Sequence, residues 1–151
     1  MTYLVFSQEP HALPDIERLR GHAERFFGCK LERLESGSTW IRVRLTSSRP
    51  PFDAELVLRV RDVTREDIDD AKTAEARGRA AGMSALAEKC GRVWEVGPTP
   101  DAEPIEAAYV ALAGICASVA LGPVMPPDRS TLFGVRGAME RLASSSAKSG
   151  K

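Results

Sequence analysis

Two neighbouring stretches decide the fold of this 151-residue chain: Trp40-Ile-Arg-Val-Arg-Leu45 and Ala54-Glu-Leu-Val-Leu-Arg-Val-Arg61. Apolar and polar side chains alternate along both stretches, which is the period of a half-buried strand. A shift of one residue between the strands would turn a whole apolar set toward water. We therefore expect an antiparallel hairpin that pairs Ile41 with Leu58 and Val43 with Leu56.

The same register defines the outward face of the hairpin. It places Arg44 opposite Glu55, Arg42 opposite Val57 and Trp40 opposite Arg59, which predicts an ion pair and a cation–π pair. This face is a candidate partner-binding surface. The simpler interpretation is a solvated sheet face with protective charges. RNA is disfavoured, because sheet readers of RNA stack two or three bases on aromatic side chains and this face offers one.

The rest of the chain reads as further strands and helices around this hairpin. Additional strands are expected over 3–6, 30–35 and 92–96, and helices over 14–27, 64–90, 104–121 and 130–143. Residues 107–121 carry no charge, so that helix should be buried on all sides. The order predicts one α+β domain, residues 1–143. About five mostly antiparallel strands should be covered by helices on one face, and a polar tail, 144–151, should be disordered.

Composition restricts the function. The 21 basic and 21 acidic residues cancel, so the chain lacks the charge of a general nucleic-acid binder. With 43% hydrophobic residues but no long uncharged apolar stretch, a globular protein without a membrane span is expected. Three separated cysteines form no disulfide framework and favour a reducing compartment, so we expect a cytoplasmic protein.

No motif for catalysis, metal binding or cofactor binding stands out. Phosphate-binding glycine patterns are missing, and His11 and His22 lack the spacing of a metal site. Cys29, Cys90 and Cys116 resemble small core residues more than nucleophiles. The interpretation is a non-enzymatic protein without metal or cofactor. The alternative is an enzyme or small-molecule binder with a pocket between sheet and helices, using Cys29, His22 or carboxylates.

The most acidic stretch lies at the start of the predicted helix 64–90. Thr64 suits the N-cap, and Asp67 three residues on predicts a loose capping-box arrangement. Glu66, Asp67, Asp69 and Asp70 lie in the first turns, where the helix dipole favours negative charge. The stretch lacks the spacing of a calcium loop. Dipole compensation and solubility explain these four carboxylates adequately. They are also a second candidate partner-binding surface, because exposed carboxylates can face a basic surface of a partner. A further acidic helix start, residues 101–106, is expected to lie near them in space.

The layout of residues 1–96 resembles small cytosolic proteins of bacterial toxin–immunity systems. It combines the short strand Tyr3–Phe6, an amphipathic helix ending in Phe26-Phe27-Gly28-Cys29, and a hairpin followed by Ala-rich sequence. The resemblance implies a protein that neutralises a toxin by binding it. Many such inhibitors are distinctly acidic, whereas this chain is neutral.

The resulting hypothesis is an immunity-type inhibitor that binds a protein partner, most concretely a co-encoded toxin. The candidate partner-binding residues are Glu66, Asp67, Asp69, Asp70, Trp40, Arg42, Arg44 and Arg59. A self-associating adaptor stays open as an alternative, in which a homodimer would bury Trp40 and Arg59.

Overall fold

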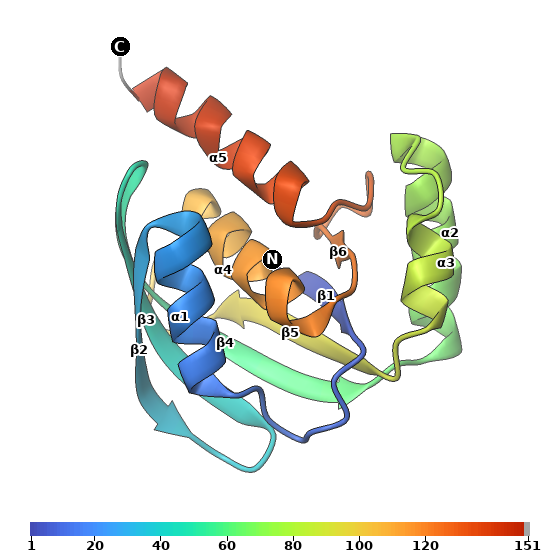
Figure 1. Ribbon diagram of the computed structural model, residues 1–151, viewed down its shortest axis with the longest axis horizontal. Helices are drawn as coiled ribbons and strands as arrows, with labels where there is room; N and C mark the ends of the chain where they lie inside the picture. Colours follow the sequence, from blue (N-terminus) through green and yellow to red (C-terminus); the bar gives the residue numbers. More distant parts are fainter. Residues whose placement is uncertain (150–151) are drawn as a thin grey trace.

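A computed structural model describes the backbone of residues 1–149 and the side chains of residues 1–144. The described residues form a six-stranded antiparallel sheet with the order β2-β3-β4-β5-β1-β6, together with five helices (Figure 1). The strands are β1 (Tyr3–Ser7), β2 (Cys29–Ser36), β3 (Trp40–Ser48), β4 (Pro51–Asp62), β5 (Arg92–Pro98) and β6 (Val124–Met125). The helices are α1 (Ile16–Phe27), α2 (Arg65–Gly78), α3 (Met83–Glu88), α4 (Glu106–Ala120) and α5 (Val135–Ser149). The predicted α+β class is confirmed.

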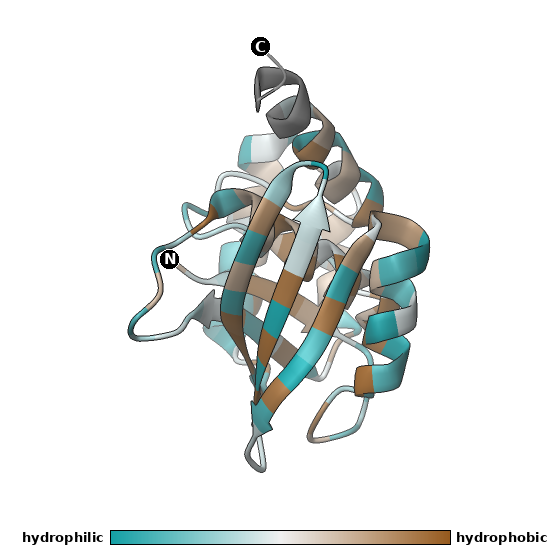
Figure 2. Ribbon diagram, turned by 90° about the vertical axis from the view of Figure 1, so that its left-hand side faces the viewer, coloured by the Kyte–Doolittle hydropathy of each residue, from teal (hydrophilic) through white to brown (hydrophobic). Residues whose placement is uncertain are grey.

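The hairpin β3–β4 has the predicted register. Ile41 pairs with Leu58 and Val43 with Leu56, and on the other face Trp40 pairs with Arg59. Hydrophobic and hydrophilic residues alternate along these strands in Figure 2. The inward side chains Val43, Leu45 and Leu58 are fully buried, which makes any other register costly.

The main core lies between the concave face of the sheet and the helices α1 and α4. α1 begins at the N-cap Asp15 and ends at Gly28, whose φ of 61° is a left-handed conformation that glycine adopts without strain. α4 is buried along 12 of its 15 residues, as its lack of charge predicted, although it begins at Glu106 and not at Pro104. α5 packs across α4.

The segment 64–90 forms two helices and not the single one that was predicted. α2 ends at Arg79, with a left-handed φ of 53°, and α3 begins after Gly82, with a φ of 88°. Gly78 and Gly82 lower the helical propensity of this segment. In addition, a side chain at position 78 would collide with Thr131. The chain therefore breaks where a neighbouring loop approaches closely.

The expectation that the helices cover one face needs a correction at one end of the sheet. α2 and α3 pack on the opposite face, where Ala71, Ala74 and Ala87 form a second core with Phe6 and Val93. Successive side chains of β1 point to opposite faces of the sheet, so Val5 lies in the main core and Phe6 in the second core. The end formed by β5, β1 and β6 is therefore covered on both faces.

The C-terminal segment also differs from its prediction. Residues 130–134 are not helical, because Phe133 forms two backbone hydrogen bonds with Val124 at 2.7 and 3.0 Å, and α5 begins only at Val135. Its backbone is described to Ser149. Most of the predicted disordered tail, 144–151, lies outside the residues whose side chains are described, so its disorder stays a prediction.

Candidate functional site

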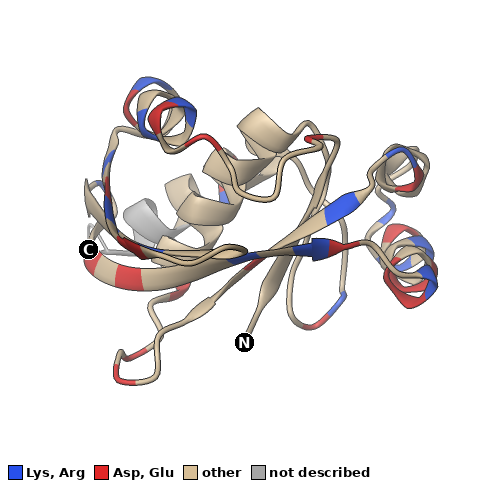
Figure 3. Ribbon diagram, turned by 90° about the horizontal axis from the view of Figure 1, so that it is seen from below, with Lys and Arg blue, Asp and Glu red and all other residues tan. Residues whose placement is uncertain are grey.

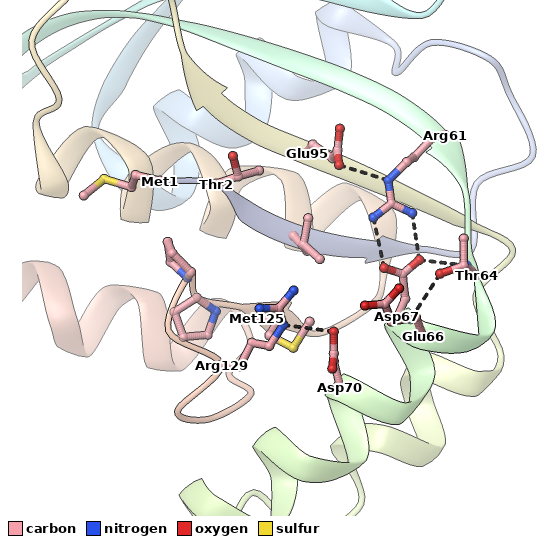
Figure 4. A pocket seen from close by; sticks show the side chains of 13 residues that line it. Met1, Thr2, Arg61, Thr64, Glu66, Asp67, Asp70, Glu95, Met125 and Arg129 are labelled. Atoms are coloured by element: carbon pink, nitrogen blue, oxygen red, sulfur yellow. Dashed lines mark hydrogen bonds and ion pairs between the residues drawn. The ribbon is translucent and has the colours of Figure 1, made fainter.

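A groove of about 550 Å³ lies beside the start of α2 (Figure 4). We call it the acidic groove. Four parts of the structure form it: the N-terminal residues before β1, the outer face of the sheet, the first turns of α2, and the end of β6 with the loop after it. The lining residues are Met1, Thr2, Leu4, Arg61, Thr64, Glu66, Asp67, Asp70, Glu95, Met125, Pro126, Pro127 and Arg129.

Asp67 is the most firmly held carboxylate of the groove. It accepts two hydrogen bonds from Arg61, at 2.7 and 2.9 Å, and one from the backbone N–H of Thr64 at 2.7 Å. The Thr64 hydroxyl accepts in turn from the Asp67 N–H, which completes the predicted capping box. Burial alone would raise the pKa of Asp67, but the bonds from Arg61 and Thr64 outweigh it and the pKa is lowered.

Arg61 joins the sheet to the helix. Its Nε donates to Glu95 on β5 at 2.9 Å while its two terminal nitrogens hold Asp67. A planar guanidinium suits this arrangement because its donors diverge in a fixed fork. Arg61 ends the alternation of β4 three residues before the N-cap Thr64, so its nearness to the helix start follows from the sequence.

Arg129 closes the opposite wall of the groove. Its Nε lies 2.9 Å from Asp70 on α2, and its backbone has a left-handed φ of 52° in the loop between β6 and α5. Pro126, Pro127 and Met125 continue this wall. No local sequence pattern predicts that this loop contacts α2, because Arg129 and Asp70 are 59 positions apart in the chain.

The side chains of the groove carry net negative charge. Four carboxylates, Glu66, Asp67, Asp70 and Glu95, face two guanidiniums, Arg61 and Arg129. Both guanidiniums already bind carboxylates. Glu66 and Asp69 are exposed on α2 and form no ion pair within the part of the chain whose side chains are described. They can accept a cation from outside without breaking an internal contact.

The predicted acidic cluster is therefore divided by the fold. Asp67 is buried in a capping and ion-pair network, Asp70 is held by Arg129, and Glu66 and Asp69 face solvent. The second acidic helix start does not join them. Glu103 lines a hollow with Asp53 and Glu55 near the start of β4, whereas α2 contacts Arg61 near the end of that strand. Figure 3 shows acidic segments (red) both on the helices at one side of the molecule and on a loop at the other side.

The predicted basic face of the hairpin is largely neutralised. Arg44 forms a bidentate pair with Asp53, at 2.8 and 2.7 Å, and not with the directly opposite Glu55. Arg42 pairs with Glu35 at 3.3 Å. Arg44 binds Asp53, its diagonal neighbour across the strands, because both carboxylate oxygens of Asp53 accept hydrogen bonds from the guanidinium.

Trp40 and Arg59 do not form the predicted cation–π pair. In the described residues such pairs occur instead between Arg25 and Phe26 and between Arg141 and Phe133. Trp40 folds over Gly37 in the β2–β3 turn, where a side chain at Gly37 would collide with the indole. Arg59 itself is exposed.

The cysteines and His22, which were considered for catalysis together with carboxylates, do not line the acidic groove. Cys29, Cys90 and Cys116 are buried, and burial raises the pKa of each thiol, that of Cys90 to about 11. His22 contacts Ser118, its Nδ1 lying 2.8 Å from the hydroxyl oxygen. That hydroxyl donates to the Ile115 carbonyl at 2.6 Å, whereas an activated serine donates its proton to the histidine.

The described residues contain neither a metal-binding cluster nor a membrane-spanning helix. They contain no group of three or more His, Cys, Asp or Glu side chains placed to hold a metal ion. No described helix combines the length and the apolar character needed to cross a bilayer. Comparisons with protein-family models, with curated proteins and with solved structures each find no match for this chain.

Proposed function

We propose that the chain is a non-enzymatic protein-binding module that docks a basic surface of its partner on the acidic groove. The observation that carries this proposal is the unequal pairing of charges in and beside the groove. Both guanidiniums are engaged, while Glu66 and Asp69 are exposed without an ion pair in the described residues. Such carboxylates attract a cationic partner and select its orientation.

The most concrete form of the proposal is an immunity-type inhibitor that neutralises a co-encoded bacterial toxin in the cytoplasm. The layout of residues 1–96 supports it, as do three free, buried thiols that need no oxidising compartment. The enzyme alternative has less support, because the carboxylates that line the groove have neither His22 nor Cys29 beside them, and these two residues do not converge elsewhere. The dimer through Trp40 and Arg59 has no specific observation in its favour.

A charge reversal tests the proposal. The co-encoded partner is purified, and its affinity for the wild-type chain is compared by calorimetry with that for Glu66→Lys and Asp69→Lys. Each reversal is expected to weaken binding about tenfold at low salt, through a slower association rate, and the difference should shrink at high salt. Asp67 is left intact, because its replacement would disturb the helix cap.

Glu24→Lys is the matched control. Glu24 is also an exposed helical glutamate without an ion pair among the described side chains, but it lies on α1, away from the groove. Its reversal should leave the affinity within about twofold of wild type. Equal affinities for wild type, Glu66→Lys and Asp69→Lys would remove the acidic groove from the mechanism.

A further inference from the structure

A second groove lies on another side of the molecule, between the end of α1, the β3–β4 turn and α5. We call it the α1–α5 groove. It has a volume of about 240 Å³, and its lining residues are Phe26, Phe27, Arg49, Met139, Leu142 and Ala143. None of these residues lines the acidic groove, so this surface is independent of the proposed function.

The lining has the composition of a protein interface. Aromatic residues, Met and Arg are the types enriched where proteins meet, and this groove contains all three. Phe26 leaves 44% of its surface exposed, although an isolated aromatic ring gains by burial. The volume lies below the range of about 300–1,000 Å³ typical of small-molecule pockets. The groove therefore suits a few side chains of a partner better than a whole ligand.

The charges around the groove specify the partner further. Arg49 is the one charged residue of the lining, and the Arg25 guanidinium lies 5.9 Å from the centre of the Phe26 ring. Within the described side chains, neither arginine forms an ion pair. An apolar floor with free guanidiniums at its rim complements an apolar side chain flanked by carboxylates.

We propose that the α1–α5 groove binds an acidic amphipathic helix of a partner protein. Apolar side chains of that helix, spaced three and four residues apart, enter between Phe26 and Met139, and its carboxylates contact Arg49 and Arg25. This is the helix-in-groove mode of recognition, in which shape and apolar burial supply affinity and rim charges supply selectivity. The two grooves then select partner surfaces of opposite charge.

Two synthetic helical peptides test this proposal with the intact chain. Both carry leucine at the same helical spacing, and the flanking residues are glutamate in one and lysine in the other. Fluorescence anisotropy should show binding of the glutamate peptide and at least about tenfold weaker binding of the lysine peptide. Phe26→Ser should weaken binding of the glutamate peptide about tenfold. Arg49→Glu should remove most of the preference between the peptides, because the new carboxylate offsets the charge of Arg25.

Leu34→Ser is the matched control, because Leu34 is a comparably exposed apolar residue, at 39%, that lies in the second half of β2 and does not line the groove. It should bind both peptides as wild type does, and circular dichroism should report the same fold for every variant. Equal affinity for the two peptides, or wild-type binding by Phe26→Ser, would overturn the proposal. A homodimer that dissociates in Phe26→Ser would also overturn it, since the occupant would then be a second copy.

Discussion

The two ends of β4 carry the same chemical contact in different surroundings. At the start of the strand, Arg44 grips Asp53 with two hydrogen bonds, and at its end Arg61 grips Asp67 in the same way. The side chains of the first pair are 49% and 50% exposed, whereas those of the second are 34% and 8% exposed. The first pair joins neighbouring strands that the backbone already pairs, and the second attaches a helix to the sheet.

The contribution of an ion pair to the free energy of unfolding depends more on its surroundings than on the geometry of its hydrogen bonds. An ion pair between two solvated side chains replaces hydrogen bonds to water and so adds little to the free energy of unfolding. Salt also screens the attraction between exposed charges. A carboxylate that is already out of water loses much more when its partner groups are removed. The two ends of β4 should therefore respond differently to the same substitution.

The largest effect is expected for Asp67→Ala. This change removes the capping box and leaves Arg61 with Glu95 as its one remaining carboxylate among the described contacts. The free energy of unfolding should fall by about 2–3 kcal/mol, less than for a fully buried pair because Arg61 is partly solvated. Urea denaturation measures it. Asp67→Asn keeps an oxygen for the cap and should lose less; equal losses would assign the effect to the ion pair with Arg61 and not to the cap.

A smaller effect is expected in the acid dependence of stability. The bonds from Arg61 and Thr64 hold the pKa of Asp67 below its ordinary value of 3.8 despite burial. A group with a depressed pKa stabilises the folded state above its unfolded pKa, and this contribution is lost as pH falls through the folded pKa. Stability measured from pH 6 downward should therefore decline below about pH 4. The decline should be shallower in Asp67→Asn, and identical acid limbs would contradict this role.

The smallest effect is expected for Asp53→Ala at the other end of β4. Arg44 lowers the pKa of Asp53, but both groups face water, so the interaction is screened. The shift in Tm should be several-fold smaller than that of Asp67→Ala, and 1 M NaCl should remove most of it. A thermal scan of both variants makes the comparison directly. Equal shifts in Tm would show that burial does not distinguish the two pairs.

Local patterns predicted the parts of the molecule that depend on neighbouring residues. The β3–β4 register follows from alternation, and the Thr64–Asp67 capping box follows from their spacing. The break between α2 and α3 was missed, because the close approach of Thr131 to Gly78 joins residues 53 positions apart. The acidic cluster was found, but its division into held and free carboxylates was not. That division depends on Arg61 and on Arg129, which arrives from a distant loop.

The sequence by itself determined the α+β class, the hairpin register and the acidic start of α2, since side-chain periodicity and capping act within one or two adjacent elements. The tertiary structure alone decided that α2 and α3 cover the opposite face of the sheet and that Phe26 stays exposed beside α5. It also decided which carboxylates meet a guanidinium. These outcomes depend on the path of the whole chain, because a charge is neutralised or left free by whatever the fold brings within a few ångströms of it.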